Sequence, residues 1–136
     1  MLYTYSITDQ TVLTDGILSF NVNGVLTGCT VSHTAGTGAI NLNRAGYYLV
    51  HFNGSFSAAS TEGDVVVQLL ANGIAVDGAT AAATDQTEGN LAFTTIVRVL
   101  PNCCAVQDNV PTTLTFENQG AGVTFINTAA TVTKLC

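Results

Sequence analysis

The chain has 136 residues, which is enough for one domain around a single hydrophobic core. Only 9 % of the residues are charged, the net charge is −6 and three residues are basic; this argues against nucleic-acid binding, which relies on Lys and Arg to neutralise phosphates. No apolar run approaches the ~20 residues of a membrane-spanning helix, and no basic segment followed by an apolar run marks a signal peptide, so membrane insertion is not expected.

The small number of charges also bears on assembly. With so few charges and no membrane segment, much of the surface is expected to be covered by other copies of the chain. The alternative is a monomer whose neutral surface is rich in Thr and Asn.

The first segment in chain order is expected to be an arm. Residues 1–15 are assigned to this N-terminal arm, and residues 16–136 to the folded domain. We predict that the arm adds a strand to the sheet edge of a neighbouring subunit, because an extended segment can pair with an open edge. Its contacting side chains would be Leu2, Tyr3 and Tyr5.

Turn-forming residues then divide the chain into short runs typical of β-strands. The ten predicted strands span residues 17–21, 30–33, 39–42, 47–56, 64–71, 74–76, 91–100, 112–118, 123–127 and 129–135. No segment keeps a period of 3.6, so no helix is expected. Many short strands at regular spacing predict a β-sandwich or a closed barrel.

Residues 47–56 form the most informative predicted strand, because side chains of different character alternate along it. One face is predicted to enter the core: Tyr48, Val50, Phe52 and Phe56. The other face is half apolar: Tyr47, Leu49, His51 and Asn53. A strand whose second face is also half apolar predicts a partner surface on that side.

Two later features point to contacts with partners. Residues 79–89 are small and polar without periodicity, which predicts a mobile or partner-contacting loop carried by Thr84, Asp85, Gln86, Thr87 and Glu88. Arg98 shares a face with Ile96 and Leu100 in an apolar strand. It is expected either to extend from a sheet edge or to pair with a carboxylate across an interface.

Three segments carry patterns of a known family. Residues 46–52 read Gly-Tyr-Tyr-Leu-Val-His-Phe, residues 65–73 end in Asn-Gly, and residues 129–135 end in Lys-Leu. In this order and spacing they resemble the tumour-necrosis-factor (TNF) and complement-globular-head superfamily, over roughly residues 16 to 135. The resemblance implies a ten-stranded, TNF-like jelly-roll β-sandwich in which three copies pack around an axis through the sheet that contains the termini.

The resemblance also implies which residues lie at a trimer interface. It puts Tyr47, Leu49 and His51 on the face toward the axis, and Arg98 is predicted to join them. If three imidazoles meet there, protonation near pH ~6.5 would weaken the trimer. The chain departs from the family in having only ~15 residues before the domain instead of a stalk, and in its adjacent Cys103 and Cys104.

No constellation in the sequence predicts catalysis, and no cofactor is expected. The four cysteines, which lack zinc-binding spacing, leave both free thiols and a disulfide open: Cys29, Cys103, Cys104 and Cys136. Glu62 with Asp64, or Asp85 with Glu88, could contribute to a calcium site, but solubilising loop charges explain them more simply, so no metal is predicted.

These observations predict a non-enzymatic homotrimeric structural or binding module on the outside of a particle. The leading hypothesis is a phage virion protein, either a capsid decoration protein or a fibre head, with other virion proteins as partners. The alternative is the globular C-terminal head of a bacterial or spore-surface collagen-like fibre that binds a host receptor or glycan. A soluble ligand that clusters a receptor is a third hypothesis, and a carbohydrate-active enzyme a fourth.

Overall fold

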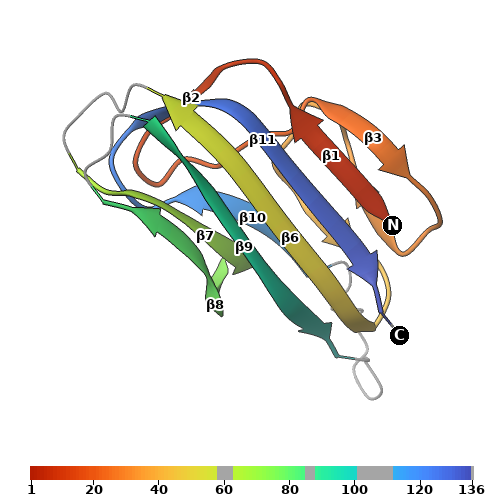
Figure 1. Cartoon of the computed structure of the whole chain (residues 1–136). Coiled ribbons are helices and arrows are strands. Elements are labelled where there is room, and N and C mark those ends of the chain that lie inside the picture. Colours follow the sequence, from red (N-terminus) through yellow and green to blue (C-terminus); the bar gives the residue numbers. More distant parts are fainter. Residues whose placement is uncertain (58–62, 85–87, 101–111, 136) are drawn as a thin grey trace.

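The computed structural model describes residues 1–57, 63–84, 88–100 and 112–135. All regular elements in these ranges are β-strands, and none of these residues forms a helix of the length and apolarity needed to cross a bilayer. The strands form two antiparallel sheets that face each other across one core (Figure 1). The β-sandwich predicted from the strand spacing is therefore confirmed.

One sheet contains the first and last strands, and we call it the terminal sheet. Its strand order is β3-β1-β11-β6-β9, and β2 pairs separately with β11. Its strands are β1 (Leu2–Ser6), β2 (Gln10–Val12), β3 (Val22–Leu26), β6 (Gly46–Ser57), β9 (Glu88–Val99) and β11 (Val123–Lys134). Because β1 and β11 are antiparallel neighbours, both ends of the chain lie at the same end of the sandwich (Figure 1).

The second sheet, which we call the opposite sheet, has the order β4-β5-β10-β7-β8. Its strands are β4 (Val31–His33), β5 (Ile40–Leu42), β7 (Val65–Ala71), β8 (Ile74–Ala83) and β10 (Thr112–Asn118). The turn between β7 and β8 consists of Asn72 and Gly73, both with positive φ (51° and 80°). This left-handed pair is what a two-residue hairpin requires.

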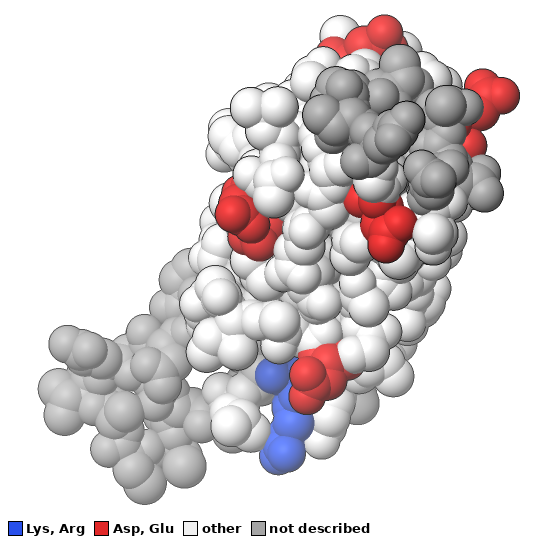
Figure 2. Space-filling model, turned by 90° about the vertical axis from the view of Figure 1, so that its left-hand side faces the viewer, with Lys and Arg blue, Asp and Glu red and all other residues white. Residues whose placement is uncertain are grey.

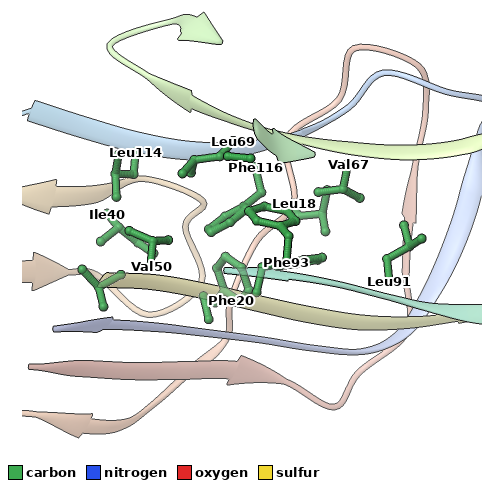
Figure 3. Packing of buried hydrophobic residues seen from close by; sticks show 14 of the residues in the cluster. Leu18, Phe20, Ile40, Val50, Val67, Leu69, Leu91, Phe93, Leu114 and Phe116 are labelled. Carbon is green, nitrogen blue, oxygen red and sulfur yellow. The ribbon is translucent and has the colours of Figure 1, made fainter. Parts of the chain in front are cut away.

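The core lies between the sheets and is centred on aromatic rings (Figure 3). The ring of Phe116 lies 5.0 Å from that of Phe52, 5.7 Å from that of Phe20 and 6.0 Å from that of Phe93, between centroids. Rings at such distances add about 0.5–1.5 kcal/mol per pair to the gain from burial. The predicted inward face of residues 47–56 is confirmed, since Tyr48, Phe52 and their partners in that alternation are fully buried.

The N-terminal segment differs from the expected arm. Residues 2–6 form β1, which is hydrogen-bonded to β11 on one side and to β3 on the other, and Leu2 is fully buried in the core. Both backbone edges of β1 are therefore used within its own chain. The expectation that Leu2, Tyr3 and Tyr5 add a strand to a neighbour's sheet was wrong, because β1 has no free edge to offer.

The predicted strand at residues 17–21 was also wrong. This segment makes only isolated bridges, from Ile17 to Glu117 and from Phe20 to Thr37. Leu18 and Phe20 are both fully buried, and the backbone of Leu18 bonds to Phe116 of the opposite sheet. The apolar residues here belong to a connecting segment that packs against the edge of the core between the two sheets. The next strand, β3, begins at Val22.

The largest differences in strand length from the prediction are in β8 and β11. β8 continues past residue 76 because an irregularity in its pairing with β7 is closed by Gln68, whose Nε2 donates to the carbonyl oxygens of Leu69, Val76 and Ala79. The predicted strands 123–127 and 129–135 form one strand, β11, with a register shift between Phe125 and Asn127. One predicted strand is absent, two are joined into one, and β1 to β3 were not predicted. The described residues therefore contain eleven strands rather than ten.

Candidate assembly surface

The outer face of the terminal sheet is rich in apolar and aromatic side chains. Its most exposed large apolar members lie on four strands: Tyr3, Val22, Val25, Tyr47 and Ile96. Strand register brings them into one surface, because Tyr3 is opposite Val25 and Thr131, while Leu49 is opposite both Ile96 and Thr133. We call the outward side chains of this region the apolar face: Tyr3, Tyr5, Val22, Val25, Tyr47, Leu49, His51, Ile96 and Arg98.

His51 lies in the middle of the apolar face. It pairs in register with Thr131 of β11 and with Thr94 of β9, and it is half-buried in the isolated chain. Its Nδ1 lies 2.7 Å from the Thr94 hydroxyl. This contact holds the imidazole against the sheet, and the ring forms part of the apolar face.

Tyr47 and Arg98 form the end of the apolar face nearest the termini. They are opposite each other in register, and the guanidinium carbon of Arg98 lies 5.8 Å from the centroid of the Tyr47 ring. A cation over a tyrosine ring at this distance is worth about 0.5–1 kcal/mol when exposed. In the single chain Tyr47 keeps 43 % of its surface exposed, so the pair is open to a partner.

Tyr3 and Tyr5 form the other aromatic part of the face. Their ring centroids are 5.5 Å apart, and both rings lie over Gly24 of β3. A Cβ at residue 24 would lie 3.0 Å from Tyr5 Cε1 and 3.1 Å from Tyr3 Cδ1. The missing side chain therefore lets the two rings lie close to the sheet.

Tyr48, the neighbour of Tyr47, has a structural role on the inner side. Its hydroxyl donates to the carbonyl oxygen of Arg44 at 2.7 Å, which ties the start of β6 to the preceding turn. Burial raises the pKa of the Tyr48 phenol, and the nearby positive charge of Arg44 opposes that shift in part.

The outer face of the opposite sheet has a different character. On β4, β5 and β10 its side chains are mainly hydroxyls and amides, with one carboxylate: Ser32, Asn41, Thr113, Thr115 and Glu117. Strand β7 adds Gln68 together with the apolar Val66 and Leu70. Several bond to one another or to the backbone; for example, Thr113 Oγ1 donates to Asn41 Oδ1 at 3.0 Å. Such a face is compatible with water.

The basic residues gather at one end of the sandwich. Arg44 precedes β6, while Arg98 and Lys134 lie at the ends of β9 and β11, close to where β6 begins. At the other end, Asp64 precedes β7 and Glu88 begins β9. Figure 2 shows from one side that an acidic group lies beside the basic ones, that other acidic groups lie toward the opposite end, and that wide uncharged areas separate the charged groups.

Several residues predicted to contact partners or metals fall elsewhere. Thr84 is exposed after β8, and Glu88 pairs with Ser57 at the start of β9 rather than lying in a loop. Outside the described residues lie Glu62, Asp85, Gln86, Thr87, Cys103, Cys104 and Cys136. Cys29 is an exposed free thiol. Within the described ranges no three His, Cys, Asp or Glu side chains are grouped as a metal site would require.

Sequence reasoning did not identify Val22 and Val25 as members of the apolar face. The register shift between Tyr3 and Thr4 places Gly24 out of step with β1, so both valines face outward although they are three positions apart. Strict alternation cannot put positions three apart on one side. The glycine between them was the available signal for such a bulge.

No protein-family model and no curated protein sequence matches the chain. Solved structures do match it over nearly its full length. The globular domain of zebrafish complement 1qA gives a TM-score of 0.71 at 8 % identity, covering 99 % of this chain and 96 % of that one. Eiger TNF from S. frugiperda gives 0.69 at 11 % identity, covering 99 % and 92 %. The PRD1 vertex protein P5 gives 0.53 at 14 % identity, covering 95 % and 93 %.

At these identities the likeness establishes the fold alone. The neighbours are TNF-like jelly rolls, and the present chain has the same fold. The resemblance seen in the order of residues 46–52, 65–73 and 129–135 is thereby confirmed at the level of architecture. The chain is thus a TNF-like jelly roll whose terminal sheet carries the apolar face.

Proposed function

We propose that the chain is a homotrimeric, non-enzymatic structural or binding module on the outside of a particle. The observation that carries the proposal is the apolar face. Tyr47 and Ile96 keep 43 % and 56 % of their surfaces exposed in the single chain, and Tyr3, Val22 and Val25 extend the same surface. Contiguous apolar surface of this kind is a mark of a protein interface.

The trimer is the form of assembly that the resemblance to the TNF and complement-globular-head superfamily favours. In that arrangement the sheet containing the termini faces the three-fold axis, which agrees with the position of the apolar face on the terminal sheet. Tyr47, Leu49, His51 and Arg98 are the proposed interface residues. The polar outer face of the opposite sheet would remain in water.

A virion is the proposed location, as a capsid decoration protein or the head of a fibre. The likeness to a PRD1 vertex protein supports this choice over a secreted ligand, although it concerns the fold alone. The alternative is the head of a bacterial or spore-surface collagen-like fibre, which the likeness to the globular domain of complement 1qA favours. Partners in either case would be other particle proteins, a host receptor or a glycan.

Light scattering coupled to size exclusion tests the assembly. A homotrimer at micromolar concentration has a mass of about 42 kDa, three times the 14.0 kDa of one chain. A single species of 14 kDa would refute the proposal.

The two locations are separated by a second experiment. Antibodies against the chain, used for immunogold labelling of purified virions and of cell or spore surfaces, should label virion exteriors. Labelling confined to cell or spore surfaces would replace the virion hypothesis with the fibre-head alternative. Turnover of a glycoside by the purified chain would contradict the non-enzymatic assignment.

A further inference from the structure

The centre of the apolar face holds a group whose charge depends on pH. His51 is flanked along β6 by Leu49 and Asn53, and across the sheet by Thr131 and Thr94. Histidine is the side chain that ordinarily changes charge between pH 5 and 8. A charge can therefore appear at the middle of the proposed interface within a range that proteins encounter.

The charged and titratable groups around His51 are few. On the strands that make up this face they are Tyr3 and Tyr5 of β1, Tyr47 of β6, Glu88 and Arg98 of β9, and Lys134 of β11. Glu88 is the single carboxylate among them, and it pairs with Ser57, six residues from His51, or roughly 20 Å along the strand. Arg98 pairs with Tyr47, four residues or roughly 13 Å away, and Lys134 pairs with Tyr48, whose side chain points inward.

Among the residues that the structure describes, an imidazolium at residue 51 would consequently have no nearby counter-charge on its own protomer. Both separations exceed the distance of about 8 Å over which charges interact at physiological salt. The hydrogen bond to Thr94 does not select a protonation state, because a hydroxyl can donate to or accept from Nδ1. In the separated protomer, water can solvate the charge on this half-buried ring.

Assembly changes that balance. Covering the apolar face removes water from His51, and burying a charge without a partner is costly. The protonated form therefore favours the separated protomers. The trimer contains three such rings, so the cost of burying the charged imidazole applies three times. The charged rings also repel one another if they meet at the axis.

We propose that protonation of His51 weakens the homotrimer, so that acidification separates the subunits. This inference rests on the proposed function, since it requires the apolar face to be the interface. A ligand that binds one state better than the other shifts the equilibrium toward it, and the proton acts here as that ligand. A coupling of ordinary size raises the dissociation constant roughly 5- to 150-fold.

Sedimentation velocity at pH 8, 7, 6 and 5, at constant ionic strength, tests the inference. The wild-type chain should be trimeric at pH 8 and should show a growing monomer fraction toward pH 5, with an unchanged far-ultraviolet circular dichroism spectrum. His51→Gln, which keeps a polar group near Thr94 but cannot take up a proton, should remain trimeric at pH 5. His51→Asn is the second variant if His51→Gln does not fold.

The outcomes separate the two proposals. A wild-type chain that is monomeric at pH 8 refutes the proposed trimer itself. A wild-type trimer that persists unchanged at pH 5 leaves the trimer intact and overturns the role of His51. Dissociation of wild type and His51→Gln to the same extent also overturns it, because His33 and the carboxylates are unchanged in the variant.

Discussion

The two outer faces of the sandwich differ although the sheets that carry them are built alike. Both sheets alternate buried and outward side chains, and both bury Val, Leu and Phe on the inside. The terminal sheet presents exposed Tyr, Val and Ile side chains among Thr and Asn on its outside. On the outside of the opposite sheet, β10 presents Thr and Glu, and the apolar Val66 and Leu70 of β7 are less exposed. The inner alternation specifies the fold, and the composition of the outer side indicates whether that side meets water or protein.

The largest expected effect comes from placing a charge on one face and then on the other. Leu49→Asp would bury an unpartnered carboxylate in the interface at a cost of about 3 kcal/mol or more, which raises the trimer dissociation constant at least about a hundredfold. Thr115→Asp puts the same group on the polar face and should leave assembly unchanged. Sedimentation of both variants measures this, and equal behaviour would remove the distinction between the faces.

Gln68 tests the opposite sheet, where a side chain is expected to support folding without affecting assembly. Gln68→Leu removes the donor to the carbonyl oxygens of Leu69, Val76 and Ala79. We expect a loss of about 1–3 kcal/mol in the free energy of unfolding, measured by urea denaturation of the monomeric Leu49→Asp background. Thr115→Val in that background is the control. A stability equal to the control would show that the carboxamide does not hold the bulge.

Tyr48 tests the inner side of β6. Tyr48→Phe loses the hydrogen bond to the Arg44 carbonyl and should reduce stability by about 1 kcal/mol at neutral pH. Because burial raises the pKa of this phenol above its ordinary value of 10.0, the folded state holds the proton more tightly than the unfolded state does. Stability from this source is present below pH 10 and is lost as the pH rises further. Denaturation at several alkaline pH values should show a smaller loss in Tyr48→Phe.

The smallest effect is expected at the Tyr47–Arg98 pair. Tyr47→Leu removes the ring under the guanidinium while keeping an apolar side chain, and we expect assembly to weaken by about 0.5–1 kcal/mol, a factor of roughly 2 to 5. Tyr47→Phe retains the ring and should match the wild type. Dissociation constants from dilution series provide the measurement. If the Leu and Phe variants behave alike, the ring does not act through Arg98.

The strands with apolar inner faces could be predicted from the sequence. Residues 47–56 alternate bulky buried and outward side chains, and Asn72-Gly73 has the conformation its turn type demands. The inward face of β1 gave no such signal, because it consists of Leu2, Thr4 and Ser6. Thr4 is fully buried through a hydrogen bond to the Val22 carbonyl, 18 residues away, and sequence alone does not reveal such a partner.

The proposed interface was predictable to a similar degree. The alternation along β6 identified Tyr47, Leu49 and His51 as outward, and the structure has them outward. Arg98 could be related to Tyr47 only after the register of β9 against β6 was known. The register of β9 against β6 depends on long-range pairing, which no local pattern encodes.

The central claim is that other copies of the chain cover the apolar face. Hydroxyl-radical footprinting of Tyr47, carried out from nanomolar to micromolar chain concentration with the buried Tyr48 as an internal reference, measures this cover directly. The account predicts that labelling of Tyr47 falls toward that of Tyr48 as the concentration rises. Labelling of Tyr47 that stays constant and high across the series would contradict it.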